Sequence, residues 1–167
     1  MTAWTGFVLA VAATAAVWDW RWRRIPRWLT APAALAGLAY HAATGGGVGA
    51  AAATGLGLGL GLLLVQMRAF GGGDAKLLAA MGALLGLRLW FWSLEFGLLA
   101  AAVVALAQLA RRQRLALLGT ELGAIVAGWR QNGLQPHPQH NLDSPQAVTA
   151  PFAVALGIGV ACAVWLF

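Results

Sequence analysis

Residues 71–76 read GGGDAK, and this glycine run with its carboxylate separates two apolar segments of the chain. Three successive glycines let the backbone adopt conformations closed to other residues and let another segment come close. An Asp that precedes an apolar run is also a good helix N-cap. Asp74 is one of only five acidic residues among 167, so the stretch indicates either a capped turn or a functional carboxylate.

The composition places the whole chain in a membrane. Hydrophobic residues make up 60% and charged residues 10%, whereas soluble domains carry about 25% charge. The mean hydropathy is +0.74. We therefore predict an all-α, polytopic fold in which residues 1–167 form a single membrane-embedded domain. The basic residues cluster beside apolar segments. This pattern favours contact with membrane lipid, including anionic headgroups, over nucleic-acid binding.

Hydropathy and breaks in the chain predict about six membrane spans. Residues 75–110 are nearly all apolar, too many for one span and enough for two, so we place a break at Gly86-Leu87-Arg88. In residues 48–67, Gly55/Gly59 and Gly57/Gly61 are small residues four apart, which favours close helix packing. Residues 115–129 are apolar enough for an interfacial helix or a further span, of which Glu121 and several glycines favour the interfacial helix, and residues 131–146 are expected to form a loop. The six predicted spans are residues 3–18, 28–43, 48–67, 75–85, 89–110 and 147–167.

The distribution of positive charge predicts the orientation of these spans. If the N-terminus lies outside, ten of the eleven Lys and Arg residues fall on the cytoplasmic side, and only Arg88 does not. Cytoplasmic loops of membrane proteins carry such an excess of positive charge. The predicted topology therefore has an external N-terminus, with the loops after the first, third and fifth spans in the cytoplasm.

This topology brings two carboxylates to the same membrane face, each at the end of an apolar span. Asp19 follows the first span, and Asp74 precedes the fourth. Two carboxyl groups that meet in a low-dielectric setting share one proton and titrate as a unit. The ionised member can take a proton from an attacking water while the protonated member stabilises the oxyanion. No metal or other cofactor is needed for this chemistry.

Other functions for the polar residues stay open at this stage. Asp19 and Asp74 could serve an ion path in a small transporter, or cap helices in a non-catalytic membrane assembly factor. Lys76 could tune the carboxylate pair or act as a plain interfacial cation. His137 and His140 have a spacing that metal sites use, but no further ligand of the right kind is near them in the sequence.

The two acidic motifs together resemble those of a known family. Asp19-x5-Ile25-Pro26 followed by Gly71-x-Gly73-Asp74-x-Lys76 is similar to the paired motif of type IV prepilin peptidases, which are GxGD-type intramembrane aspartyl proteases. The resemblance implies that Asp19 and Asp74 form the catalytic dyad. It also implies a prepilin substrate, whose short basic leader is removed at the cytoplasmic face of the bacterial inner membrane. The residues implied to bind substrate or support the loop are Gly71, Gly73, Lys76, Ile25 and Pro26.

Three further features bear on this resemblance. Residues 150–152, Ala-Pro-Phe, are similar to the opening of the family's last span. Arg27 stands where family members often have Asn. The cytoplasmic insert with paired cysteines that longer members carry is absent, which makes N-methyltransferase activity doubtful, and the small size resembles the subgroup that serves Flp/Tad-type pili. The sequence leaves the oligomeric state open.

Overall fold

The computed structural model describes residues 2–111, 119, 123, 127–128 and 152–167. Each regular element in those ranges is a helix, so the expected all-helical class is confirmed for that part of the chain. Most of the predicted interfacial helix, the loop with His137 and His140, and the beginning of the sixth span lie outside the described residues. The helices are α1 (Ala3–Trp22), α2 (Arg27–Ala43), α3 (Gly47–Gln66), α4 (Gly72–Arg111) and α6 (Phe152–Leu166).

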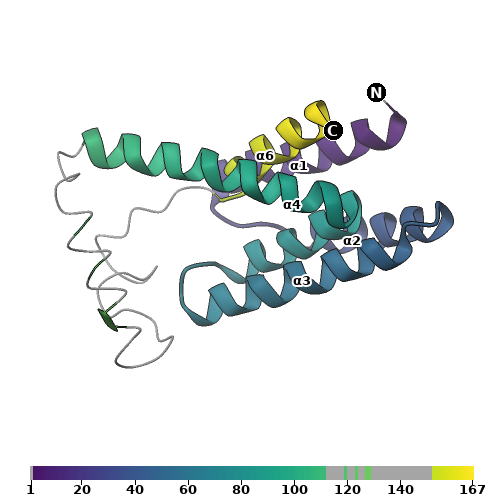
Figure 1. Cartoon of the computed structure of the whole chain (residues 1–167), viewed down its shortest axis with the longest axis horizontal. Coiled ribbons are helices and arrows are strands. Elements are labelled where there is room, and N and C mark those ends of the chain that lie inside the picture. The colour runs from purple at the N-terminus through teal and green to yellow at the C-terminus, as the bar shows by residue number, and fades with distance from the viewer. Residues whose placement is uncertain (1, 112–118, 120–122, 124–126, 129–151) are drawn as a thin grey trace.

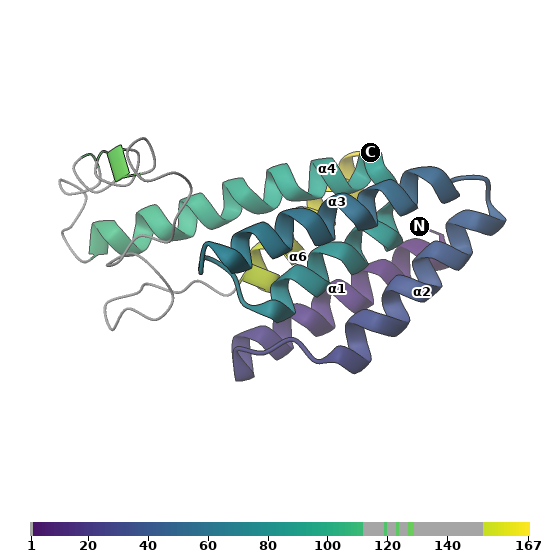
Figure 2. The same cartoon turned by 90° about the horizontal axis from the view of Figure 1, so that it is seen from below.

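The helices form a bundle whose two ends carry different parts of the chain. Figures 1 and 2 place the N-terminus and the C-terminus at one end. The end of α1, the start of α2, the connection from α3 to α4 and the start of α6 lie together at the other end. Both predicted acidic motifs belong to this second end, which we call the loop end.

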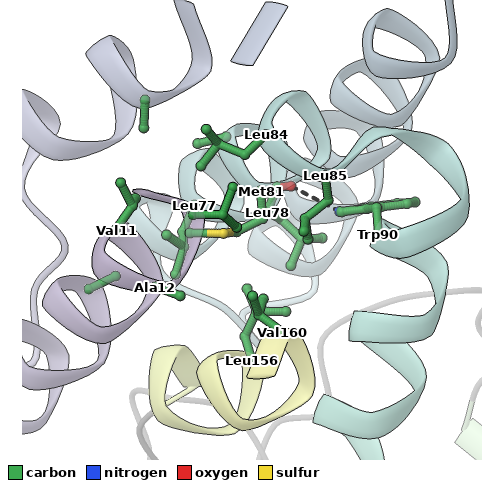
Figure 3. Packing of buried hydrophobic residues seen from close by; sticks show 14 of the residues in the cluster. Val11, Ala12, Leu77, Leu78, Met81, Leu84, Leu85, Trp90, Leu156 and Val160 are labelled. Carbon is green, nitrogen blue, oxygen red and sulfur yellow. Dashed lines mark hydrogen bonds between the residues drawn. The ribbon is translucent and has the colours of Figure 1, made fainter. Parts of the chain in front are cut away.

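The first half of α4 forms the centre of the bundle. Its residues from Leu77 to Leu85 are all buried, and α4 packs against α3, α6 and α2. Figure 3 shows the side chains of this half between those of α1 and those of α6. A helix that is apolar on all sides is expected at the centre of a membrane bundle, and its N-terminal turn carries the glycine motif.

The chain reverses within α4 at Gly86, as the sequence predicted. Gly86 has φ 69° and ψ 173°, which are not helical and belong to a region that is essentially open only to glycine. The indole Nε1 of Trp90 donates to the carbonyl oxygen of Leu78 at 3.1 Å, a contact that a straight helix could not make across twelve residues. Figure 3 shows this hydrogen bond beside the buried leucines.

The reversal is tied to α1 and α2 at the end away from the loops. The carbonyl oxygen of Leu84 accepts from Trp4 Nε1 at 3.2 Å and from His41 Nε2 at 3.2 Å. Trp4 also stacks on Tyr40 with ring centroids 3.8 Å apart. A helix break leaves carbonyl groups without their usual backbone donors, so these side chains satisfy an acceptor that the reversal exposes.

Small residues allow α3 to approach α4 closely, but only one of the two predicted glycine pairs does so. A Cβ on Gly57 would lie 2.7 Å from the carbonyl oxygen of Leu78, and a Cβ on Gly61 would lie 2.5 Å from the Cα of Ala75. A Cβ on Gly55 or Gly59 would meet nothing within 4 Å. The pair Gly57/Gly61 therefore makes the helix contact.

Three of the described helices are long and apolar enough to cross a membrane. They are Ala3–Trp22, Gly47–Gln66 and Gly72–Gln108 by length and composition, and Phe152–Leu166 is a shorter apolar helix. The count of six spans and the external N-terminus remain predictions.

Candidate active site

Asp19 lies inside α1 rather than in the loop that follows it. We expected the first span to end near Trp18, but the helix continues to Trp22 because no Gly or Pro interrupts it. It ends at Arg23, whose φ of 52° is left-handed and whose N–H donates to the carbonyl oxygen of Asp19. Asp19 is 6% exposed. The helix thus holds its carboxyl group inward, toward the bundle.

A backbone donor of α6 binds this buried carboxylate. The N–H of Ala153, in the first turn of α6, donates to Asp19 Oδ2 at 3.1 Å. The first N–H groups of a helix have no partner within the helix, so the carboxylate satisfies one of them. A negative charge at a helix N-terminus is also favoured by the helix dipole. Sequence analysis missed this contact, since a backbone N–H leaves no signal in residue types.

Asp74 lies in the first turn of α4, which begins at Gly72 and not at Ala75 as expected. Its Oδ2 accepts the N–H of Gly71 at 3.0 Å. In a capping box, the side chain of the third helical residue accepts the backbone N–H of the N-cap residue. Asp74 and Gly71 form this half of the motif. The carboxylate therefore does cap the helix, although the N-cap position itself belongs to Gly71.

The two carboxylates lie near each other at the loop end of the bundle. Asp19 and Asp74 are close enough for a charge–charge interaction. Each accepts a backbone N–H at the start of a different helix, α6 for Asp19 and α4 for Asp74. Two positive helix ends thus face two like charges, and they offset part of the repulsion between the carboxylates.

The glycine loop packs against the segment between α1 and α2. A Cβ on Gly73 would lie 3.2 Å from the Cβ of Ile25 and 3.4 Å from its backbone nitrogen. Ile25 therefore occupies the space beside Gly73. A Cβ on Gly72 would meet nothing within 4 Å, and Gly72 is exposed, so the open side of the loop is at Gly72. Pro26 is the N-cap residue of α2 and ends the connecting segment.

Lys76 lies on a different face of α4 from Asp74. It is exposed and lies two residues after Asp74 on the same helix, and residues two apart on a helix point in different directions. The geometry therefore favours the interfacial cation over direct tuning of the pair.

Exposed basic and aromatic side chains surround the site on the α1–α2 side. Trp20, Trp22 and Trp28 are 70%, 52% and 58% exposed. The rings of Trp18 and Trp22 lie 4.5 Å apart, and Arg21 lies 5.8 Å from the Trp22 ring. Such amphipathic rings occupy the headgroup level of a bilayer. The exposed arginines of this segment are Arg21, Arg23, Arg24 and Arg27.

One of three comparisons with known proteins found a match. Residues 6–109 match the model of the type IV leader peptidase family, and this range includes both carboxylates and the glycine loop. No curated protein and no solved structure matches the chain. The family is one of membrane proteases, and the apolar helices fit a membrane protein. Because the match covers more than half of the residues of this chain, the chain belongs to the type IV leader peptidase family.

Proposed function

We propose that the protein is an intramembrane aspartyl endopeptidase that removes the leader peptide from prepilins at the cytoplasmic membrane face. Asp19 and Asp74 are the proposed catalytic pair. The observation that carries the proposal is their proximity: two of the five acidic residues, from distant parts of the chain, lie at one end of the bundle, close enough for the charge of Asp19 to act on Asp74. Membership of a leader peptidase family supports the same reaction class.

The proposed mechanism uses one shared proton. The ionised carboxylate takes a proton from water while the water oxygen bonds to the scissile carbonyl carbon. The protonated carboxyl group donates a hydrogen bond to the oxyanion that develops. When the tetrahedral intermediate collapses, the C–N bond breaks and the leaving nitrogen takes a proton from the pair. The pair then again holds one proton, and no metal or other cofactor takes part.

The open side of the glycine loop is the proposed approach of the substrate. Gly72 is exposed and has no neighbour within 4 Å of its Cβ position, two residues before Asp74. An extended peptide backbone needs such a surface without a side chain to come close. Gly73 supports the site in another way, by accommodating Ile25.

Two finer assignments belong to the same proposal. The absence of a cysteine-rich insert favours a peptidase without N-methyltransferase activity, of the type that serves Flp/Tad-type pili. The positive residues of the α1–α2 segment favour the cytoplasmic face of the bacterial inner membrane, with anionic lipid headgroups as neighbours.

The test is to replace each carboxylate by an amide and to follow leader removal from a co-expressed prepilin. Asn retains an oxygen that can accept from Gly71 or Ala153, so Asp19→Asn and Asp74→Asn keep the capping contacts and remove only the ionisable group. Loss of a general acid or base costs about 10²- to 10⁴-fold in rate. We expect each variant to insert into the membrane and to lose cleavage to that extent.

A matched control separates this effect from a general loss of charge. Glu95 lies in the second half of α4 and is exposed, so Glu95→Gln makes the same chemical change away from the pair. We expect it to cleave as the unmodified protein does. If both Asp→Asn variants cleave at the normal rate, the peptidase proposal is wrong, and a non-catalytic assembly factor or ion path becomes the better account.

A further inference from the structure

Two phenylalanines stand directly before the two backbone groups that bind the carboxylates. Phe70 precedes Gly71, whose N–H donates to Asp74. Phe152 precedes Ala153, whose N–H donates to Asp19. The rings of Phe70 and Phe152 contact each other, with centroids 4.4 Å apart and planes inclined by 48°. Both side chains pack against the buried core.

The geometry of the peptide unit connects each of the two phenylalanines to one of the donor N–H groups. A peptide N–H lies in one rigid plane with the Cα of the preceding residue. The Cα of Phe70 therefore lies in the same plane as the donor to Asp74, and the Cα of Phe152 in the same plane as the donor to Asp19. A contact between the two rings joins the two planes that hold the carboxylates.

We propose that Phe70 and Phe152 are positioning residues that set the separation of Asp19 and Asp74 through their ring contact. This inference rests on the proposed function for its catalytic consequence. The three glycines that follow Phe70 supply no side chain of their own, so this ring is the nearest side-chain anchor on the N-terminal side of the loop. Its partner belongs to α6, which lies beyond the residues that match the family model.

The inference makes a different prediction from simple core filling. If the two rings only fill space in the core, the loss of one ring weakens folding but leaves the rate of the folded molecules unchanged. A lost positioning contact lowers kcat while KM stays the same, because the reacting groups are misplaced and the substrate surface at Gly72 is not. The two rings act through one contact, so their effects are non-additive.

The experiment compares Phe70→Leu, Phe152→Leu and the double variant of the full chain, using a peptide that spans a prepilin cleavage site. We expect kcat to fall about tenfold in each single variant and no further in the double variant. Phe70→Tyr keeps the ring and restores kcat. The matched control is Trp92→Leu, which breaks the stacked Trp92–Phe167 pair, 4.7 Å apart, and leaves kcat unchanged.

A second measurement does not depend on peptidase activity. Hydrogen exchange followed by mass spectrometry reports the amide of Ala153 in Phe70→Leu and the amide of Gly71 in Phe152→Leu. We expect exchange across the contact to accelerate by up to about tenfold, the effect of one lost aromatic pair, and Trp92→Leu to leave both amides unchanged. Unaltered exchange at both amides overturns the inference, even where Asp19→Asn abolishes cleavage and the proposed function stands. Equal and additive losses in kcat would also overturn it.

Discussion

Gly73→Ala is the most informative single change at the loop, because the structure predicts its effect from one contact. The added Cβ would lie 3.2 Å from the Cβ of Ile25 and 3.4 Å from its nitrogen. Ile25 precedes Pro26, whose ring restricts the backbone, so the connecting segment has little freedom to yield. We expect the segment after α1 to move and the site that α1 carries to be disturbed.

Gly72→Ala provides the matched control for this effect. Both glycines lie in the first turn of α4, so the gain in helix propensity, about 1 kcal/mol, is common to the two variants. Overpacking costs about 1–3 kcal/mol, and only Gly73→Ala meets a neighbour. The free energy of unfolding should therefore be lower in Gly73→Ala than in Gly72→Ala by about 1–3 kcal/mol.

Unfolding in detergent and steady-state cleavage of a prepilin peptide test the pair of variants. In Gly73→Ala we expect the displaced site to raise the activation free energy by about 1.4 kcal/mol. This increase lowers kcat about tenfold. In Gly72→Ala we expect kcat to persist and KM to rise, because the new methyl group occupies the proposed approach of the substrate. Equal stability of the two variants would refute the packing argument at Ile25, and an unchanged KM in Gly72→Ala would refute the approach over Gly72.

The remaining predictions concern the bundle and its surroundings. Gly57→Ala and Gly61→Ala should lower the thermal midpoint in detergent by separating α3 from α4, while Gly55→Ala and Gly59→Ala should not. Gly86→Ala should destabilise the fold by about 1–3 kcal/mol, measured by chemical unfolding, because an L-residue is strained at φ 69°. Cleavage in nanodiscs should be faster with anionic than with zwitterionic lipid, and equal rates would contradict the proposed headgroup contact. Mass spectrometry of the mature pilin should find an unmethylated N-terminus, whereas a methylated one would contradict a peptidase-only activity.

Much of the architecture could be predicted from the sequence because apolar length and charge are strong signals. The break at Gly86 followed from a stretch too long for one span, and the non-helical backbone confirms it. The gathering of the acidic motifs at one end followed from the alternation of the spans, because the end of the first span and the start of the fourth lie on the same face. These are properties of segments, and they survive small errors in where each helix begins and ends.

Local geometry could not be predicted in the same way. Gly and Leu alternate in residues 55–61, so the two glycine pairs are equivalent in the sequence, and only the position of α4 selects Gly57 and Gly61. The ends of α1 and α4 each extend beyond the expected residues, which moves both acids into helical turns. Helix ends are uncertain by one or two residues even when a structure is known, so apolar patterns alone do not fix them.

The helix ends also explain how the fold tolerates two carboxylates at this place. Like charges brought together away from water repel strongly. Helix capping alone does not require two of the chain's five acidic residues to lie together. Each carboxylate takes a backbone N–H from a helix start, one from α6 and one next to α4, so two dipole ends offset part of the repulsion. Backbone donors at two helix starts therefore stabilise negative charge at the place where the proposed hydrolysis puts its catalytic pair.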